Sequence, residues 1–392
     1  MTETDPVVPL VVVVDDEPET QRTVFRHAPP ERARFEILSP DEVDEEVLNS
    51  ADLVMVDYVI DNWEARDNTP RLGLRPGNGI ALTAVLREHA GRLENPTGFA
   101  LNTGKPGALW LTPAETRTHL IARNYNLEWV FLKSDGDQNI RQAISLASAI
   151  RRLPPTWPGD DHARATYLVQ RLLGLMRGTD EDSRPPWTSM ALSDVESCRP
   201  PLTELAERNH GLLFLRWLLQ RILPYPCFLY DSHRLAARLR VSHACLKGAL
   251  VGELGDWLRP YIFQGVLQDF AGDRWWRSGV EYALWEITGG LSVTAGDLRE
   301  ELSRRANVEL RPALAADPII CIDENYQVLD EALSLGQVVR IQPDDWPSYA
   351  SQAWTTIELA KQHPRLRAMV LDEGQDQLSN PDDQAPCTEA QT

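Results

Sequence analysis

Four runs of mostly apolar residues within the first 150 positions constrain this chain more than any other feature. They occupy residues 7–14, 51–57, 98–102 and 128–132, and a weaker run follows the first at 36–39. Such unbroken hydrophobicity is typical of parallel strands that are buried on both faces. Helix-like stretches separate the runs, at 19–27, 41–48, 79–91, 113–124 and 137–152. The alternation predicts a doubly wound α/β domain with a five-stranded parallel sheet.

A Pro-rich segment after residue 152 divides the 392-residue chain. We expect the α/β domain at 1–153, a linker at 154–161 and a mostly α-helical domain at 162–315. A small α+β segment is expected at 316–371 and an acidic, disordered tail at 372–392. Helical periodicity marks 162–177, 202–223, 233–250 and 275–287, whereas 319–341 predicts a strand–turn–strand and 347–363 a further helix.

Charge and cysteine content exclude several classes of protein. The formal net charge is −19, so the surface repels nucleic acids and anionic membranes unless a basic patch is segregated. No apolar run approaches the roughly 20 residues that span a bilayer. Five scattered cysteines contain no CxxC pair, which favours free thiols over a disulfide framework or a zinc site. We therefore expect a cytoplasmic protein that does not enter the membrane.

Chemically active side chains follow the ends of the predicted strands. Asp15 and Asp16 follow the first strand, Asp57 ends the third, Thr103 follows the fourth and Lys133 the fifth. Ligands of open parallel sheets bind beyond the carboxyl ends of the strands, so these side chains should converge. Three carboxylates in one pocket repel one another and need a cation, and oxygen ligands suit Mg²⁺. An ionised Asp57 could then attack a phosphoryl group whose oxygens pair with the lysine and the hydroxyl.

The pattern resembles the receiver domain of two-component response regulators, a flavodoxin-like fold. The matching motifs are Val-Val-Asp15-Asp16-Glu17-Pro18, Leu-Val-Met-Val-Asp57, Ala-Leu-Asn-Thr103-Gly104 and Val-Phe-Leu-Lys133, within residues 8–152. The resemblance implies that Asp57 is the phosphoacceptor, that Thr103 is the switch hydroxyl and that Lys133 pairs with the phosphate. It also implies that Mg²⁺ binds Asp16, Asp57 and the backbone carbonyl of Val59, with Asp15 supporting the metal. A sensor histidine kinase would be the phosphoryl donor. The only activity expected would be self-phosphorylation and dephosphorylation.

Several positions depart from the family pattern. Ser134 stands where the family has proline after its lysine, Val130 where an aromatic residue is common, and Ile60-Asp61 where a Met-Pro pair is usual. Segments 61–78 and 105–112 are longer than the usual connections. These departures leave a second reading open, in which the domain is a degenerate docking module that works without phosphorylation.

The output of the second half stays open at the level of sequence. Residues 233–250 resemble a helix-turn-helix, with Val241-Ser242 at the turn and Arg240 in place of the usual glycine. The surrounding region is close to neutral, which favours a plain helical hairpin over DNA binding. We expect an unidentified protein partner and a possible homodimer, while an enzymatic output domain is not excluded.

Histidines and acidic turns in this half carry no obvious motif. His210, His233, His243 and His363 lack metal-ligand spacing and are predicted to be ordinary surface histidines. The pairs Asp323-Glu324 and Asp330-Glu331 are predicted to lie in solvated turns.

Overall fold

The computed structural model describes residues 8–378 apart from 64, 65, 67, 69–75, 94, 110–116, 160, 177–183, 208 and 209. The chain forms two compact units. The first comprises Met1–Thr188, Arg199–Pro224 and Phe263–Asp273, and the second comprises Ser189–Cys198, Tyr225–Ile262 and Arg274–Thr392. Among the described residues, no helix combines the length and the apolar character needed to cross a membrane.

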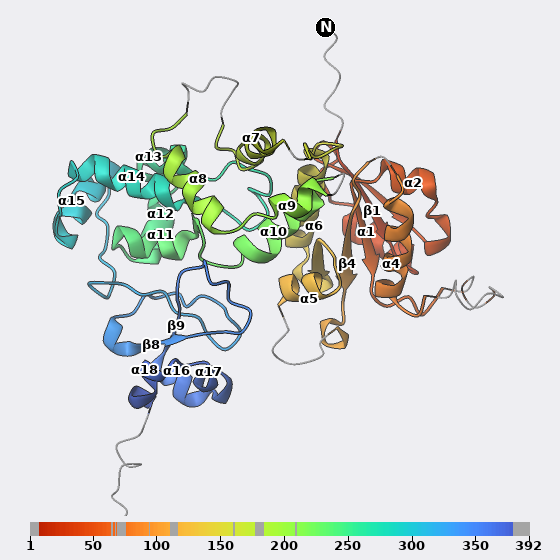
Figure 1. Ribbon diagram of the computed structural model, residues 1–392. Coiled ribbons are helices and arrows are strands. Elements are labelled where there is room, and N and C mark those ends of the chain that lie inside the picture. The colour runs from red at the N-terminus through yellow and green to blue at the C-terminus, as the bar shows by residue number, and fades with distance from the viewer. Residues whose placement is uncertain are drawn as a thin grey trace, which may run out of the picture. The chain divides into compact units, whose positions relative to one another are not determined.

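The predicted five-stranded parallel sheet is confirmed, with the strand order β2-β1-β3-β4-β5 (Figure 1). Its strands are β1 (Leu10–Val14), β2 (Arg34–Leu38), β3 (Leu53–Asp57), β4 (Gly98–Thr103) and β5 (Trp129–Leu132). The chain order reverses between β1 and β3, which is the switch point where such sheets bind ligands. The carboxyl ends of these two strands carry Asp15 and Asp57.

Helices cover both faces of the sheet (Figure 1). They are α1 (Pro18–Phe25), α2 (Glu45–Ser50), α4 (Gly79–Ala90), α5 (Thr118–Asn124) and α6 (Asp137–Arg151). Alternate strand residues such as Val12, Val54 and Leu101 share one core with α2, α4 and α5. All residues of β1 and β3 are buried, as the apolar runs predicted. The predicted start of the fourth helix, at 113–116, lies outside the described residues.

Helix α4 begins in direct contact with the backbone of Asp57, the candidate phosphoacceptor. The N–H of Gly79 donates to the carbonyl of Tyr58 at 2.8 Å, and the Asn78 side chain caps the helix. A Cβ at position 79 would lie 1.9 Å from the carbonyl oxygen of Asp57, so a side chain there cannot fit without moving the strand end or the helix. Glycine at this position therefore fixes the end of β3 against α4.

Gly79→Ala should destabilise the protein by at least about 2 kcal/mol, because its methyl group collides with the backbone rather than with a movable side chain. Gly77→Ala is the matched control, since its Cβ meets no atom within 4 Å, and it should change stability by less than about 0.5 kcal/mol. Urea unfolding of both variants measures the difference. Equal midpoints for the two variants would refute the close contact.

The first compact unit extends past the predicted boundary at the Pro-rich segment. It includes α7 (His162–Leu172), α9 (Leu202–Ala206), α10 (Leu212–Trp217) and the π-helical turn η7 (Leu218–Ile222). Arg216 of α10 donates from Nε to a carboxylate oxygen of Glu128 at 2.7 Å, and the amide of Gln220 donates to the carbonyl of Leu127 at 2.7 Å. Glu128 is completely buried and also accepts from the N–H of Phe99 in β4. A buried ion pair thus joins α10 to the sheet.

Arg216→Met should cost about 3–5 kcal/mol of stability, because it leaves the charge of Glu128 buried without its partner. The double variant Glu128→Gln/Arg216→Met should recover much of this loss, because glutamine keeps an acceptor for Phe99 and carries no charge. Thermal or urea unfolding of the two variants provides the comparison. A double variant that is less stable than the single one would contradict the assignment.

The second compact unit contains short helices and two small antiparallel sheets. Its helices are α8 (Thr188–Ser197, from its second residue on), α11 (Ser232–Leu239), α12 (His243–Ala249), α13 (Glu253–Leu258), α14 (Arg277–Thr288), α15 (Ala295–Ala306), α16 (Ile357–Gln362), α17 (Pro364–Ala368) and α18 (Asp372–Gln375). Strand β6 (Leu229–Tyr230) pairs with β7 (Trp275–Trp276), and β8 (Val338–Ile341) pairs with β9 (Ala353–Thr356). The predicted helical hairpin at 233–250 is present as α11 and α12, with Arg240 in the left-handed conformation at the turn.

Other predicted elements of this half need correction. The predicted helix at 275–287 begins as strand β7, because its two buried tryptophans pair with β6. The predicted helix at 202–223 is interrupted and forms α9, α10 and η7. The predicted strand–turn–strand at 319–341 is reduced to isolated bridges, Ile319 with Leu333 and Ile322 with Val328, before β8 begins.

The C-terminal predictions are also partly wrong. The expected helix at 347–363 contains strand β9, whose Ala353 and Thr355 are buried against β8, and α16 starts after it. The expected disordered tail begins with ordered structure, α18 followed by the 3-10 turn η10 (Asp376–Leu378). Leu378 is buried in the core of β8, β9 and α16, so apolar burial holds this segment in place. Residues 379–392 lie outside the described residues.

Candidate functional site

The three aspartates predicted from sequence lie together at the carboxyl ends of β1 and β3. Each of Asp15, Asp16 and Asp57 offers a carboxylate oxygen within 4.8 Å of the others. Asp15 and Asp57 are buried, with 2% and 6% of their surface exposed, whereas Asp16 is half-buried. Burial of two adjacent carboxylates is costly unless a cation balances them. The site therefore has the charge of a cation-binding pocket.

Lys133 reaches this cluster from the end of β5. Its Nζ lies 3.0 Å from Asp57 Oδ2 and 3.2 Å from Asp15 Oδ2. Lys133 lies more than 75 positions after either aspartate in sequence, and the parallel register of β1, β3, β4 and β5 brings the three residues to the same edge. The sequence predicted that these side chains converge; the structure adds that one ammonium group bridges the two buried aspartates.

The surroundings shift the ionisation of this cluster. Burial raises the pKa of Asp57 to about 6, against the opposing attraction of Lys133, and the neighbouring charges of Asp15 and Asp16 raise it further. Burial also raises the pKa of Asp16, although the backbone N–H of Asn62 opposes this. Burial would lower the pKa of Lys133, but its contacts with Asp57 and Asp15 outweigh this effect and raise it. One lysine therefore only partly relieves the repulsion among three carboxylates.

Thr103 ends β4 beside this edge and is completely buried. Its hydroxyl oxygen accepts from the backbone N–H of Lys105 at 3.1 Å, within the turn that follows the strand. Asn102 and Lys105, rather than Thr103, line the cavity over the carboxylates. The structure thus brings Thr103 to the correct strand end and not to the cavity wall.

The cavity over the aspartates has a volume of about 470 Å³ and is open to solvent. Its wall includes Asp61 and Val59, and the backbone carbonyl of Val59 is the third metal ligand predicted from sequence, after Asp16 and Asp57. Asn62 follows and was not foreseen as part of the site: its N–H donates to Asp16 at 2.6 Å and its amide to Glu17 at 2.7 Å. The sequence signal that could have identified Asn62 is its position in the loop that follows β3. This loop holds the acidic side chains of the β1–α1 turn in position.

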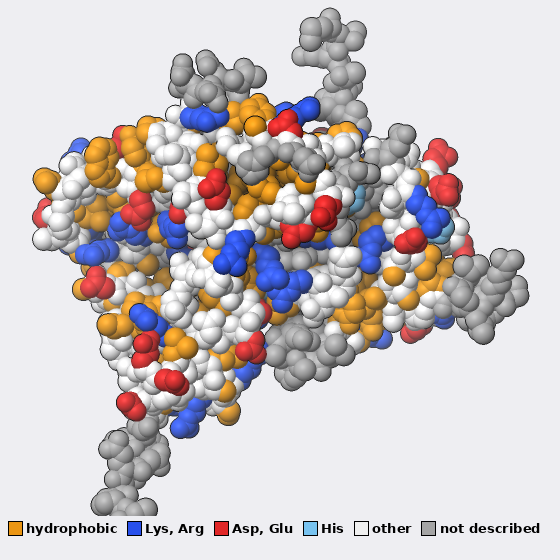
Figure 2. All heavy atoms as spheres, viewed as in Figure 1, with side chains coloured by type: hydrophobic (Ala, Val, Ile, Leu, Met, Phe, Trp, Pro, Cys, Tyr) orange, Lys and Arg blue, Asp and Glu red, His pale blue; other side chains and the backbone are white. Residues whose placement is uncertain are grey.

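The arginines of the α11–α12 hairpin are already paired with carboxylates. Arg234 contacts Asp231, Arg238 contacts Glu281 and Arg240 contacts Asp317. On the face of the molecule in Figure 2, basic and acidic side chains are interspersed. These pairs reduce the positive charge that the hairpin could offer to a phosphate backbone.

No protein-family model matches the sequence. A search of curated proteins likewise gives no match.

Asp57→Asn should stabilise the protein at pH 7.5 in a chelating buffer by on the order of 1 kcal/mol. The folded-state pKa of Asp57, about 6, lies above the ordinary value of 3.8, so the folded protein binds the proton more tightly and loses stability as pH rises from about 4 through 6. Asp57→Asn does not lose stability in this way. The difference in stability between the variant and the wild type should therefore shrink at pH 5 and vanish below about pH 4. Thermal unfolding across this range, with Asp61→Asn as a control on the same cavity wall, measures the effect. An advantage of Asp57→Asn that does not change with pH would contradict it.

Proposed function

We propose that the α/β region is the receiver domain of a two-component response regulator, in which Asp57 accepts a phosphoryl group from a sensor histidine kinase. The observation that carries this proposal is the bridging of buried Asp15 and Asp57 by Lys133, beside Asp16, at the switch point of a 2-1-3-4-5 parallel sheet. A structural ion pair would need one carboxylate for one ammonium. Three carboxylates around one lysine leave an excess of negative charge that suits a divalent cation and a phosphoryl group.

The donor set fits Mg²⁺. Asp15, Asp16 and Asp57 provide carboxylate oxygens within 4.8 Å of one another, and Val59 lines the same cavity. When bound, the ion would neutralise carboxylate charge and draw the oxygens of an incoming phosphoryl group toward Asp57. Among these residues, Asp16 and Asp57 would bind directly and Asp15 would support the site.

The reaction is a transfer between two protein side chains. A carboxylate oxygen of Asp57 attacks phosphorus, the P–O bond of the aspartyl phosphate forms, and the P–N bond of the phosphohistidine breaks. The histidine nitrogen keeps the electron pair of that bond. Lys133, already 3.0 Å from Asp57, pairs with the phosphoryl oxygens and holds the acceptor in place. Hydrolysis of the acyl phosphate later restores the carboxylate.

Thr103 connects this chemistry to a conformational change. Its hydroxyl is held in the β4 turn by the N–H of Lys105, and Lys105 itself lines the cavity. A switch hydroxyl must reach a phosphoryl oxygen, so phosphorylation would have to rearrange the Thr103–Lys105 turn. The turn is followed by segment 110–116, outside the described residues, and then by α5. Movement of this turn would alter the surface offered to a partner protein or a second copy of the chain.

Purified protein incubated with acetyl phosphate and Mg²⁺ should gain the mass of one phosphoryl group, and the gain should be lost in EDTA and in Asp57→Asn. Asp61→Asn removes an acidic group from the same cavity wall without touching the carboxylate triad, and it should still be phosphorylated. Intact-mass spectrometry within minutes and again after hours follows formation and hydrolysis. Phosphorylation that persists in Asp57→Asn would place the acceptor elsewhere.

Failure of acetyl phosphate, phosphoramidate and a phosphorylated histidine kinase panel alike would reject phosphotransfer. The alternative would then be a docking module that works without phosphorylation. In that case the binding of a partner to the wild-type protein and to Asp57→Asn should be equal.

A further inference from the structure

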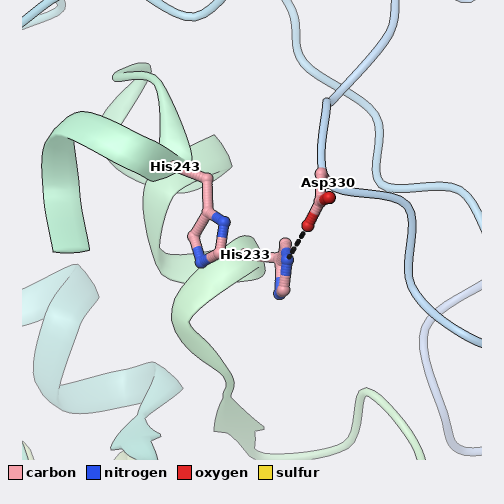
Figure 3. Close-up of side chains that lie close together, drawn as sticks. All are labelled: His233, His243 and Asp330. Atoms are coloured by element: carbon pink, nitrogen blue, oxygen red, sulfur yellow. Dashed lines mark ion pairs between the residues drawn. The ribbon is translucent and has the colours of Figure 1, made fainter.

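A second cluster of metal-ligating side chains lies in the second compact unit. His233 is in the first turn of α11, His243 is the first residue of α12, and Asp330 lies in the loop before β8 (Figure 3). Each offers a ligand atom within 4.8 Å of the other two. The imidazole centroids are 3.7 Å apart, and His233 Nε2 lies 3.6 Å from Asp330 Oδ1. The sequence predicted ordinary surface histidines without metal-ligand spacing, and the structure stacks the imidazoles of His233 and His243 against each other.

The turn between the two helices fixes the distance between the histidines. Arg240 takes the left-handed conformation, and the Ser242 side chain caps α12 by accepting from the N–H of Cys245. The Ser242 N–H in turn donates to the carbonyl of Arg311 at 2.9 Å. Leu235, Leu239 and Leu246 are completely buried beneath the hairpin. The two imidazoles are thus held together by a packed scaffold rather than by flexible loops.

The hydrogen bonds of the two rings leave nitrogen atoms available. His233 Nε2 is buried and has no hydrogen-bond partner among the described residues. His243 Nε2 lies 2.9 Å from the hydroxyl oxygen of Ser232, which leaves Nδ1 as the nitrogen of that ring available to a metal. Metal-bound histidines commonly use their second nitrogen for such an outer hydrogen bond. Burial, followed by the neighbouring His233 and Lys247, lowers the pKa of His243, and a neutral imidazole is the form that binds metal.

Asp330 is the solvent-exposed member of the cluster. The carboxylate of Asp330 is almost fully exposed, whereas the side chain of His233 is 21% exposed. All three residues line an open cavity of about 550 Å³. Two imidazoles with one carboxylate form a mixed nitrogen–oxygen donor set, which suits Zn²⁺ and related transition metals better than Mg²⁺.

We propose that His233, His243 and Asp330 bind a divalent transition-metal ion, with Zn²⁺ as the representative metal. Three protein ligands leave one position of a tetrahedral ion for water or for a small anionic ligand from the cavity. The bound metal would also tie the loop that carries Asp330 to the α11–α12 hairpin. This site shares no residue with the carboxylate triad, and it does not depend on the proposed phosphotransfer.

Untagged, full-length protein with the Asp57→Asn substitution is the material for the test, because the carboxylate triad could otherwise bind zinc. Zinc titration by calorimetry should show one equivalent bound, and Co²⁺ should give the visible absorption of a nitrogen-ligated ion. In this background Asp330→Asn should weaken zinc binding at least tenfold, and His243→Gln should abolish it. Asp330→Asn should leave the fold intact, because the Asp330 side chain is exposed.

His363→Gln is the matched control, because His363 also lies beside a carboxylate, Glu324 at 3.8 Å, outside the cluster. It should bind zinc as tightly as its parent. The absence of zinc binding in the Asp57→Asn protein would overturn the proposal. Equal zinc affinity in Asp330→Asn, His243→Gln and His363→Gln would overturn it as well, since the ion would then bind elsewhere.

Discussion

The fold of the first compact unit buries two carboxylates almost completely at the floor of an open cavity, and most of its site follows from that constraint. Asp15 and Asp57 continue the two strands at the centre of the sheet, whose other residues are completely apolar and buried. Their side chains share the ammonium of Lys133. With Asp16, one positive charge faces three negative ones. Burial, and to a smaller extent the charges of Asp15 and Asp16, raises the pKa of Asp57 against the attraction of Lys133. A site of this kind gains stability when a cation binds.

Sequence alone could predict this site because each part of it depends on local patterns. The apolar runs define the strands, the aspartates and the lysine stand at their ends, and parallel strands all end at the same edge. Thr103 was placed on the right strand, but its orientation was not predictable. That orientation depends on the hydrogen bond from Lys105 in a turn without regular periodicity. Asn62 was missed for a similar reason, because it acts from an irregular loop.

The second half was less predictable because its contacts join residues distant in sequence. The local sequence around Trp275 and Trp276 predicts a helix. These two residues form a strand instead, because they pair with β6, about 45 residues earlier in the chain. Glu128 and Arg216 are 88 positions apart, so their buried ion pair leaves no local signal. His233 and His243 are ten residues apart, a spacing that matches no single helix or strand. The turn at Arg240 brings them face to face, and Asp330 joins them from almost 90 residues beyond.

Charge balance indicates how phosphorylation of the first site would be transmitted. Three carboxylates, one lysine and one divalent cation sum to a formal charge of zero, so the loaded site would be electrically balanced. Conversion of the Asp57 carboxylate into a doubly ionised acyl phosphate adds one negative charge. Lys133 already contacts Asp57, and further donors belong to the β4 turn, where Lys105 lines the cavity and its backbone N–H donates to the Thr103 hydroxyl. Under the proposed phosphotransfer, the added charge would favour a turn in which this hydrogen bond is exchanged for hydrogen bonds to the phosphoryl oxygens. Helix α5 follows that turn in the chain.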